Sequence, residues 1–345
     1  MSADHLTSSP ELPGIDVPRV DAWLGDAGLV GPFSYSMIVG GRSNLTYRIT
    51  NGAGNRFVLR RPPLGHVLAT AHDVAREHRI ISALQGSSVP VAPVVGLCTD
   101  DSVNGAPFYV MQFVDGVVLD SPTAGDSVPE AVRARASDQL IDVMTALHAV
   151  DVDSVGLGDL ARRGGYLDRQ LKRWKSQWDQ SKTRELPLMD EVHHRLVSSQ
   201  PVEHTVGIVH GDYRLGNCIV DPTTGDLRAV LDWELCTLGD VLADIGYLLV
   251  YWSDPSGPQV AENDPSGRRG FPSRAQMVQR YAVATGRDVA DIRYFEAFSC
   301  WRLACIAEGV LARYAAGVMG DSTGFDHHAS QLRVDALAER AANLL

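Results

Sequence analysis

The sequence predicts an α+β protein of two lobes, in which a small antiparallel lobe of five strands and one helix precedes a larger, mainly helical lobe. Two observations predict this division. Strand-like segments dominate residues 34–113, whereas helical periods dominate from residue 129 onward. The length of 345 residues and the hydrophobic content of 45% are sufficient for two cores. We therefore expect one lobe over residues 1–115 and a second over residues 116–345.

The first lobe should open with a short leading helix over about residues 16–29, because Asp16 is a good helix cap and Gly28 lies near the expected end. Three strands then follow, SYSMIV, LTYRI and RFVLR, the last two joined by the turn NGAGN. A helix is expected from about His66 to Leu84. A hairpin around Asn104-Gly105, a dipeptide that accepts positive φ, supplies the last two strands, over residues 94–99 and 107–113.

The second lobe is predicted to be mainly helical. The expected segments are residues 129–149, 165–182, 187–199 and 240–252, with several more from residue 273 to the end. Only short strands interrupt them, on either side of the stretch VHGDYRLGNCIVDP.

Composition excludes several classes of protein. The net charge of −11 argues against general nucleic-acid binding, which needs a basic surface. No apolar run reaches the length of a membrane span, and the polar, proline-bearing start has no secretory pattern. The five cysteines are scattered and odd in number, as is typical of reduced thiols. We therefore expect a cytoplasmic protein with neither a nucleic-acid nor a membrane partner.

One segment is strongly basic, although the chain as a whole is acidic. Residues 162–184 carry eight basic residues against two acidic ones and contain all three lysines of the chain. The segment is either a solvated helix face or a landing site for an anionic group on a substrate. Its stripe of Leu167, Leu171, Trp174 and Trp178 at helical spacing predicts a buried face.

The stretch VHGDYRLGNCIVDP places polar residues on a loop between two short apolar runs. Asp212 precedes Asn217 by five positions, and Asp232 and Glu234 follow at the end of another strand-like run. Since Asp232 and Glu234 are two positions apart, we expect them on the same strand face. The aspartate could accept a proton from an attacking hydroxyl, while the asparagine and Asp232 could hold magnesium, which prefers oxygen ligands. The alternative is a turn in which Asp and Asn only cap backbone groups. Two such motifs in this order favour a reaction centre.

HGDYRLGN followed by LDWELCTLGD resembles the signature of the aminoglycoside phosphotransferase and choline kinase-like superfamily, which has the protein-kinase-like fold. The likeness extends from about Ser36 to Tyr251. In detail, GGRSNLTYRI, FVLRRPP and HGDYRLGN resemble the subgroup that occurs in animals as a kinase-like domain fused to acyl-CoA dehydrogenases. The resemblance implies that His210 braces the loop, and that Asp240 and Asp244 cap and anchor the following helix.

The resemblance also implies a nucleotide site in the first lobe. The residues it identifies are Gly41 and Ser43 of the phosphate-covering hairpin, Arg60, Glu77, and the adenine-gripping hinge residues Met111, Gln112 and Val114. Because no lysine lies outside residues 172–182, Arg60 in FVLR must replace the lysine that holds the phosphates in kinases. Strand alternation places Val58 and Arg60 on one face and Arg61 on the other. Glu77 would be the ion-pair partner of Arg60.

The implied activity is magnesium-dependent transfer of the γ-phosphoryl group of ATP to a hydroxyl of a small molecule, with Asp212 as the base and Asn217, Asp232 and Glu234 at the metal. The sequence does not decide whether the phosphoryl acceptor is an aminoglycoside, another alcohol, or an anionic hydroxy acid or hydroxyacyl-CoA. It also does not decide between ATP and GTP as the donor. Two other functions stay open as well. A degenerate kinase could bind nucleotide as a scaffold, and a hydrolase could use Asp212 and Asp232 as paired acid and base.

Overall fold

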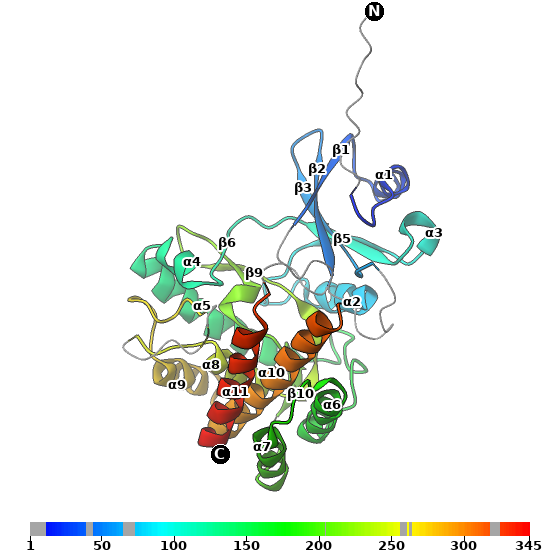
Figure 1. Ribbon diagram of the computed structural model, residues 1–345. Coiled ribbons are helices and arrows are strands. Elements are labelled where there is room, and N and C mark those ends of the chain that lie inside the picture. The colour runs from blue at the N-terminus through cyan, green and yellow to red at the C-terminus, as the bar shows by residue number, and fades with distance from the viewer. Residues whose placement is uncertain are drawn as a thin grey trace, which may run out of the picture. The chain divides into compact units, whose positions relative to one another are not determined.

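The computed structural model describes residues 12–38, 44–64, 73–203, 205–255, 261, 264–317 and 325–345 (Figure 1). The chain forms two compact units. Unit 1 comprises Met1–Gly86 with Pro90–Asp115, and unit 2 comprises Ser87–Val89 with Gly116–Leu345. Unit 1 contains a five-stranded antiparallel sheet and unit 2 is mainly helical, so the predicted fold class is confirmed.

The sheet of unit 1 has the strand order β1-β2-β3-β5-β4. Its strands are β1 Phe33–Met37, β2 Leu45–Asn51, β3 Arg56–Arg61, β4 Val94–Cys98 and β5 Phe108–Gln112. The pairing of Tyr47 with Leu59, and of Leu59 with Val110, places apolar side chains on one face. The adjacent row, Thr46–Arg60–Tyr109, therefore points to the other face. Arg60 and Arg61 lie on opposite faces, as the alternation predicts.

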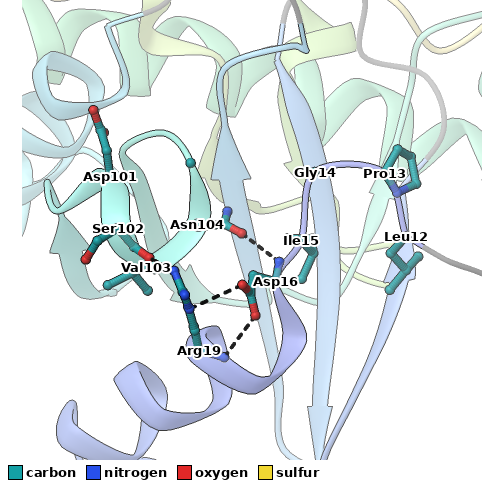
Figure 2. Close-up of a pocket in the computed structure, with 11 residues that line it drawn as sticks. Leu12, Pro13, Gly14, Ile15, Asp16, Arg19, Asp101, Ser102, Val103 and Asn104 are labelled. Carbon is teal, nitrogen blue, oxygen red and sulfur yellow. Dashed lines mark hydrogen bonds and ion pairs between the residues drawn. The ribbon is translucent and has the colours of Figure 1, made fainter.

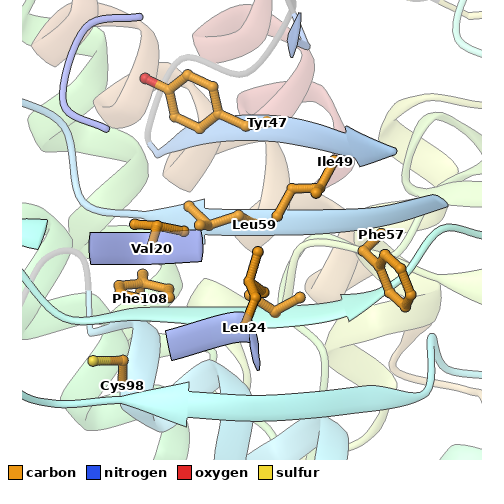
Figure 3. Close-up of a cluster of buried hydrophobic side chains, with 9 residues drawn as sticks. Val20, Leu24, Tyr47, Ile49, Phe57, Leu59, Cys98 and Phe108 are labelled. Carbon is orange, nitrogen blue, oxygen red and sulfur yellow. The ribbon is translucent and has the colours of Figure 1, made fainter. Parts of the chain in front are cut away.

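Helix α1, Val17–Asp26, covers the apolar face of this sheet. Asp16 caps it by accepting a hydrogen bond from the backbone N–H of Arg19 at 3.3 Å. Figure 3 shows Val20 and Leu24 among the aromatic and aliphatic side chains of the strands, and both are fully buried. Truncating such a leucine to alanine typically costs about 2–5 kcal/mol. The leading helix is therefore an integral part of the core of unit 1.

Helix α2, Val74–Leu84, begins after Asp73, whose side chain accepts from the backbone N–H of Arg76 at 2.9 Å. Residues 66–72 of the predicted helix lie outside the described residues. The hairpin connection differs from the prediction. Strands β4 and β5 pair as expected, but a short helix, α3 Asp101–Asn104, lies between them, and Gly105 ends it at φ 68°. Gly105 thus uses its positive φ to terminate a helix.

In its described residues, unit 2 contains the four helices predicted before residue 273 and three after it. They are α5 Glu130–His148, α6 Tyr166–Ser181, α7 Pro187–Ser198, α8 Leu242–Val250, α9 Arg274–Thr285, α10 Ile292–Ala315 and α11 His327–Leu344, with a short unpredicted α4, Pro122–Asp126. The stripe on α6 is buried, as its spacing predicts. None of the helices in the described ranges is long and apolar enough to cross a membrane.

Two small antiparallel sheets in unit 2 carry the loops of interest. Strand β7, Val206–Val209, pairs with β10, Thr237–Asp240. Strand β8, Cys218–Val220, lies between β6, Val117–Val118, and β9, Leu227–Val230. Every residue of α8, which follows β10, is buried. The loops from β7 to β8 and from β9 to β10 therefore rest on strands and a helix that form the core of unit 2.

Candidate active site

The predicted reaction centre lies in two loops of unit 2. Residues 210–217 connect β7 to β8, and residues 231–236 connect β9 to β10. Leu231 donates its backbone N–H to the carbonyl oxygen of Asn217 at 2.8 Å. His210 Nε2 lies 2.9 Å from the carbonyl oxygen of Leu231. These hydrogen bonds join the loops side by side, so the two polar motifs of the sequence form one centre.

Asp212 and Asn217 are in direct contact. Asn217 is buried, whereas 18% of the Asp212 side-chain surface is exposed. Asn217 Nδ2 donates to both the backbone oxygen and Oδ2 of Asp212, each at 2.8 Å. Because the amide nitrogen is directed at Asp212, the Asn217 side-chain oxygen is the atom left for a cation. One loop thus presents a partly accessible carboxylate and a buried amide oxygen.

Arg214 is a further charged residue at this centre, and the sequence motifs did not identify it. Its Nε lies 3.4 Å from Asp212 Oδ1, and its guanidinium lies over the Tyr251 ring at 5.1 Å. Burial by itself would lower the pKa of Arg214, but the Asp212 carboxylate and the neighbouring tyrosines raise it above its ordinary value. The side chain therefore stays cationic beside Asp212, with 20% of its surface exposed.

Asp232 begins the second loop in an unusual backbone conformation. Its φ of 65° makes it the one non-glycine residue with positive φ among the described residues. A left-handed residue of this kind is uncommon outside Gly, Asn and Asp. Trp233–Leu235 then form a 3-10 turn. The prediction that Glu234 shares a strand face with Asp232 is wrong, because the backbone leaves the strand conformation at Asp232.

The side chains at this centre could supply only part of the coordination shell of a magnesium ion. Within the described ranges, no group of three or more His, Cys, Asp or Glu side chains could hold a metal by itself. Magnesium commonly binds through one or two carboxylates together with substrate phosphates and water. A donor set of Asn217 and Asp232, with Glu234 two residues further on, fits such an incomplete protein site.

His210 braces the first loop, as the resemblance implied. Its side chain is fully buried and packs on the Trp233 ring at a centroid distance of 4.7 Å. The backbone N–H of Asp212 lies 3.1 Å from His210 Nδ1, which must therefore accept. Nε2 must then carry the hydrogen that it donates to Leu231. Both ring nitrogens are engaged by the backbone, so His210 has no free nitrogen for a substrate.

Asp244 binds the backbone of the same loop, which differs from the helix-capping role expected for it. It accepts the backbone N–H groups of His210 and Gly211 at 2.7 and 2.8 Å, instead of capping α8. Asp240 lies one residue before Val241, the N-cap of α8, and its Oδ1 accepts from the backbone N–H of Leu242, the first residue of α8, at 3.0 Å. Burial alone would raise the pKa of Asp244, but the hydrogen bonds from His148 and from the Gly211 backbone hold it below its ordinary value. Asp244 is thus a buried carboxylate that fixes the loop backbone.

Gly211 is required at its position. Its φ is 84°, and an added Cβ would lie 2.8 Å from the carbonyl oxygen of Leu235. Its own carbonyl oxygen accepts a hydrogen bond from Arg302 Nη2, on α10. Arg302 is buried, and its guanidinium lies 4.7 Å from the centre of the Tyr247 ring. The peptide groups before Asp212 are therefore held from α8 and from α10.

In unit 1, the ion pair expected from the sequence is present. Arg60 Nε lies 3.1 Å from Glu77 Oε2, and Glu77 is buried at 2% side-chain exposure. Glu77 also accepts hydrogen bonds from Asn44 Nδ2 at 2.9 Å and from the Tyr109 hydroxyl at 3.1 Å. Burying a carboxylate is costly unless it is paired and hydrogen-bonded. Glu77 meets that condition and fixes the Arg60 side chain.

The other nucleotide-site residues are at the end of β5 or outside the described residues. Met111 and Gln112 belong to β5, and Val114 follows it, half-buried. Gln112 and Phe113 already donate their backbone N–H groups, to the carbonyls of Pro93 and Arg56. Gly41 and Ser43 lie outside the described residues.

The basic segment of residues 162–184 is extensively paired. Lys175 Nζ lies 2.6 Å from Asp179 and 3.1 Å from Asp190, and Lys182 lies 2.9 Å from Glu185. Arg163 and Arg184 also pair with carboxylates. These partners neutralise much of the local positive charge, which favours the solvated-face interpretation.

We therefore expect that replacing both Lys172 and Lys175 by alanine leaves the acceptor KM unchanged. Exposed ion pairs contribute only about 0–1 kcal/mol, so the melting temperature should fall by little. Steady-state kinetics at low and high salt test this. A rise of the acceptor KM that added salt reproduces in the wild type would restore the landing-site interpretation.

A surface hollow in unit 1 is separate from the predicted site. Figure 2 shows the chain before α1 facing α3 across it, with Asn104 Oδ1 accepting the backbone N–H of Asp16 at 2.9 Å. Its volume is about 700 Å³. None of the predicted site residues lines this hollow. Its lining comes from the segment before α1, from α1 itself and from α3 with Gly105.

Comparisons with known proteins agree with the architecture. A family model described as the phosphotransferase enzyme family matches residues 34–277. Acyl-CoA dehydrogenase family member 10 from Mus musculus is 33% identical over 297 residues, which are 85% of this chain and 28% of that protein. Acyl-CoA dehydrogenase family member 11 from Gallus gallus is 33% identical over 323 residues, or 91% of this chain and 40% of that protein. The chain thus spans well under half the length of these relatives.

Solved structures show the same fold. A protein from Ralstonia eutropha, provisionally assigned as an aminoglycoside phosphotransferase, superposes with a TM-score of 0.78 at 34% identity, covering 95% of this chain and 98% of that one. A phosphotransferase solved with GDP and kanamycin gives a TM-score of 0.64 at 17% identity, covering 95% and 99%, and shows the fold alone. The resemblance inferred from the sequence is confirmed: this chain belongs to the phosphotransferase enzyme family.

Proposed function

We propose that this phosphotransferase uses ATP and magnesium to phosphorylate a hydroxyl group of a small molecule. The observation that carries the proposal is the pairing of Asp212 with Asn217 on a loop that is hydrogen-bonded to the loop of Asp232. A hydrolase with paired acid and base groups would give the buried Asn217 no task. Phosphoryl transfer uses all three residues.

Asp212 is the proposed base. The acceptor oxygen forms a bond to the γ-phosphorus while the bond from that phosphorus to the β,γ-bridging oxygen breaks, so that ADP leaves and the hydroxyl proton passes to Asp212. Asn217 and Asp232, with support from Glu234, would hold magnesium, which when bound supplies neutralising charge to the phosphates. The protein contributes mainly position and fixed charge.

Nucleotide binding is assigned to unit 1. Arg60, fixed by Glu77, is the proposed phosphate ligand in place of a lysine; a planar guanidinium can bind a phosphate through two parallel hydrogen bonds. Adenine is assigned to the segment of Met111, Gln112 and Val114. Since the N–H groups of Gln112 and Phe113 are used, Val114 is the expected backbone donor. Gly41 and Ser43 remain the proposed phosphate-covering residues.

For the acceptor we propose an anionic alcohol, and among these a hydroxyacyl-CoA or the free hydroxy acid. Two observations support this choice. The relatives that contain a segment similar to this chain within a longer protein are named acyl-CoA dehydrogenase family members. Arg214 is a partly accessible cation beside Asp212, with 20% of its side-chain surface exposed. The paired helix of residues 162–184 is no longer the preferred contact.

A panel of acceptors tests this proposal. We expect magnesium-dependent ADP formation from ATP to be stimulated by hydroxyacyl-CoA or hydroxy acids, and not by kanamycin. Stimulation by kanamycin alone would overturn the anionic acceptor while keeping the phosphotransferase. ATP binding without ADP formation across the panel would instead favour the scaffold function. Replacing ATP with GTP in the same assay decides the donor.

Arg214 should matter for turnover. Replacing it with glutamine removes the charge beside Asp212, the proposed base, and we expect kcat to fall by about 10-fold to 100-fold, in line with the loss of one charge-stabilising contact. Arg214→Lys should recover part of the rate. Arg228→Gln, at an exposed ion pair on β9, is the matched control. A kcat for Arg214→Gln equal to that of the control would remove Arg214 from the reaction centre.

A further inference from the structure

A chain of buried polar side chains leads away from the catalytic loop through three helices. Asp244 on α8, which binds the loop backbone, is contacted at Oδ2 by His148 Nε2 at 3.2 Å. His148, near the end of α5, has its Nδ1 2.8 Å from the hydroxyl of Tyr281 on α9. Both His148 and Asp244 have no exposed side-chain surface, and Tyr281 is also fully buried.

With a neutral His148, the direction of each hydrogen bond in this chain follows, because the Asp244 carboxylate can only accept. Arg287 Nη1 lies 3.5 Å from the Tyr281 oxygen, and an arginine can only donate. The Tyr281 hydroxyl is therefore free to donate its own hydrogen to His148 Nδ1. Burial raises the pKa of Tyr281 to about 12, so the hydroxyl keeps this hydrogen. His148 then carries its ring hydrogen on Nε2 and donates it to Asp244.

Asp244 is the point where this chain meets the loop. Its two carboxylate oxygens accept from His148, from the N–H of His210 and from the N–H of Gly211. If His148 took the other tautomer, its Nε2 could not donate, and Asp244 would face an acceptor in a buried site. Such a contact is costly away from water. The orientation of the Asp244 carboxylate, and with it the peptide groups just before Asp212, therefore depends on Tyr281.

We infer that His148 and Tyr281 are positioning residues for the phosphoryl transfer, acting through Asp244 to hold the backbone that carries Asp212. The inference rests on the proposed function and deepens it. Neither residue touches a reacting group. Their effect is on the placement of the base, and displacement of a catalytic group by about 1 Å can cost on the order of 100-fold in rate.

The variant Tyr281→Phe tests the chain with the least disturbance. It removes the hydroxyl and keeps the ring that packs edge-on against His148. We expect kcat to fall by about 10-fold, which is less than the cost of displacing the base by a full ~1 Å. The KM for ATP should stay unchanged. The matched control is Tyr294→Phe, which removes another buried hydroxyl that donates to a backbone carbonyl, that of Leu196, at 2.8 Å. The control should lose similar stability and keep its kcat.

Substitutions of His148 add a rescue. A glutamine at this position can accept from Tyr281 and donate to Asp244, whereas a leucine can do neither. We expect His148→Leu to lose kcat and His148→Gln to recover most of it. A kcat for Tyr281→Phe equal to that of Tyr294→Phe would overturn the inference, as would equal losses for His148→Gln and His148→Leu.

Failure of this inference is distinguishable from failure of the proposed function. Assays with wild type and Asp212→Asn under the same conditions establish whether Asp212 acts in the transfer. If Asp212→Asn is inactive while Tyr281→Phe and both His148 variants turn over normally, the function stands and the positioning chain does not. If Asp212→Asn is as active as wild type, the proposed function fails first.

Discussion

Replacing Asp212 with asparagine is expected to lower turnover by about 10²–10⁴-fold, the range usual for the loss of a general base. The substitution keeps the shape of the side chain but removes the acceptor for the hydroxyl proton. Steady-state kinetics with ATP and an active acceptor, together with direct titration of ATP, provide the measurement. Nucleotide affinity should be unchanged, because Asp212 is not assigned to the nucleotide.

Fold integrity must be separated from chemistry in this variant. Asn217 Nδ2 donates to the backbone oxygen of Asp212 and to its side-chain Oδ2. In Asp212→Asn, at least the hydrogen bond to the backbone oxygen can be kept. The melting temperature should therefore change by little. Turnover close to that of the wild type, in a variant that melts normally, would show that Asp212 is not the base.

Replacing Asp232 with alanine should abolish the magnesium-dependent stabilisation by ATP. A ligand at 100 times its dissociation constant stabilises a protein by about 2.7 kcal/mol, which a thermal melt detects readily. The loss is expected because the carboxylate that would join the ion to the protein is gone. The melt is measured with ATP in the presence of magnesium and again with a chelator.

Asp226→Ala provides the matched control for this melt. Asp226 lies in the turn before β9, where 47% of its side-chain surface is exposed and it pairs with Arg135. It should retain the full magnesium-dependent shift. A shift of wild-type size in Asp232→Ala would assign the metal to other residues or remove it from the mechanism.

Local patterns in the sequence predicted the parts of the site that depend on neighbouring residues. Strand alternation placed Arg60 on the face opposite Arg61, and the structure pairs it there with Glu77. The spacing of Asp212 and Asn217 placed both on one loop. These predictions succeed because a strand or a short loop fixes its own side-chain directions.

Predictions failed where the backbone departs from a regular period. Strand alternation does not apply to Glu234, because Asp232 adopts a left-handed conformation, which no periodicity reveals, and a 3-10 turn follows it. The family resemblance implied that Asp244 caps and anchors the following helix, and capping is a common role for an aspartate near a helix start. Its real partners, the N–H groups of His210 and Gly211, lie more than thirty positions away.

Long-range partners were beyond the reach of the sequence. Tyr281 contacts His148 across 133 positions, and Arg302 contacts Gly211 across 91. Nothing in the local pattern around Tyr281 or Arg302 distinguishes these residues from ordinary buried ones. One available signal was chemical: Asp244 interrupts an apolar run, and a buried carboxylate must be hydrogen-bonded or paired.

The most direct test of the account is phosphorus NMR of wild-type protein with magnesium, ATP and a hydroxyacyl-CoA. The predicted result is a new phosphate monoester resonance that grows as the γ-phosphate of ATP declines, with ADP appearing in equal amount and with no ester formed by Asp212→Asn. If the γ-phosphate is converted only to inorganic phosphate, or if ATP stays intact across hydroxyacyl-CoA, hydroxy acid and aminoglycoside acceptors, the chain does not catalyse the proposed transfer.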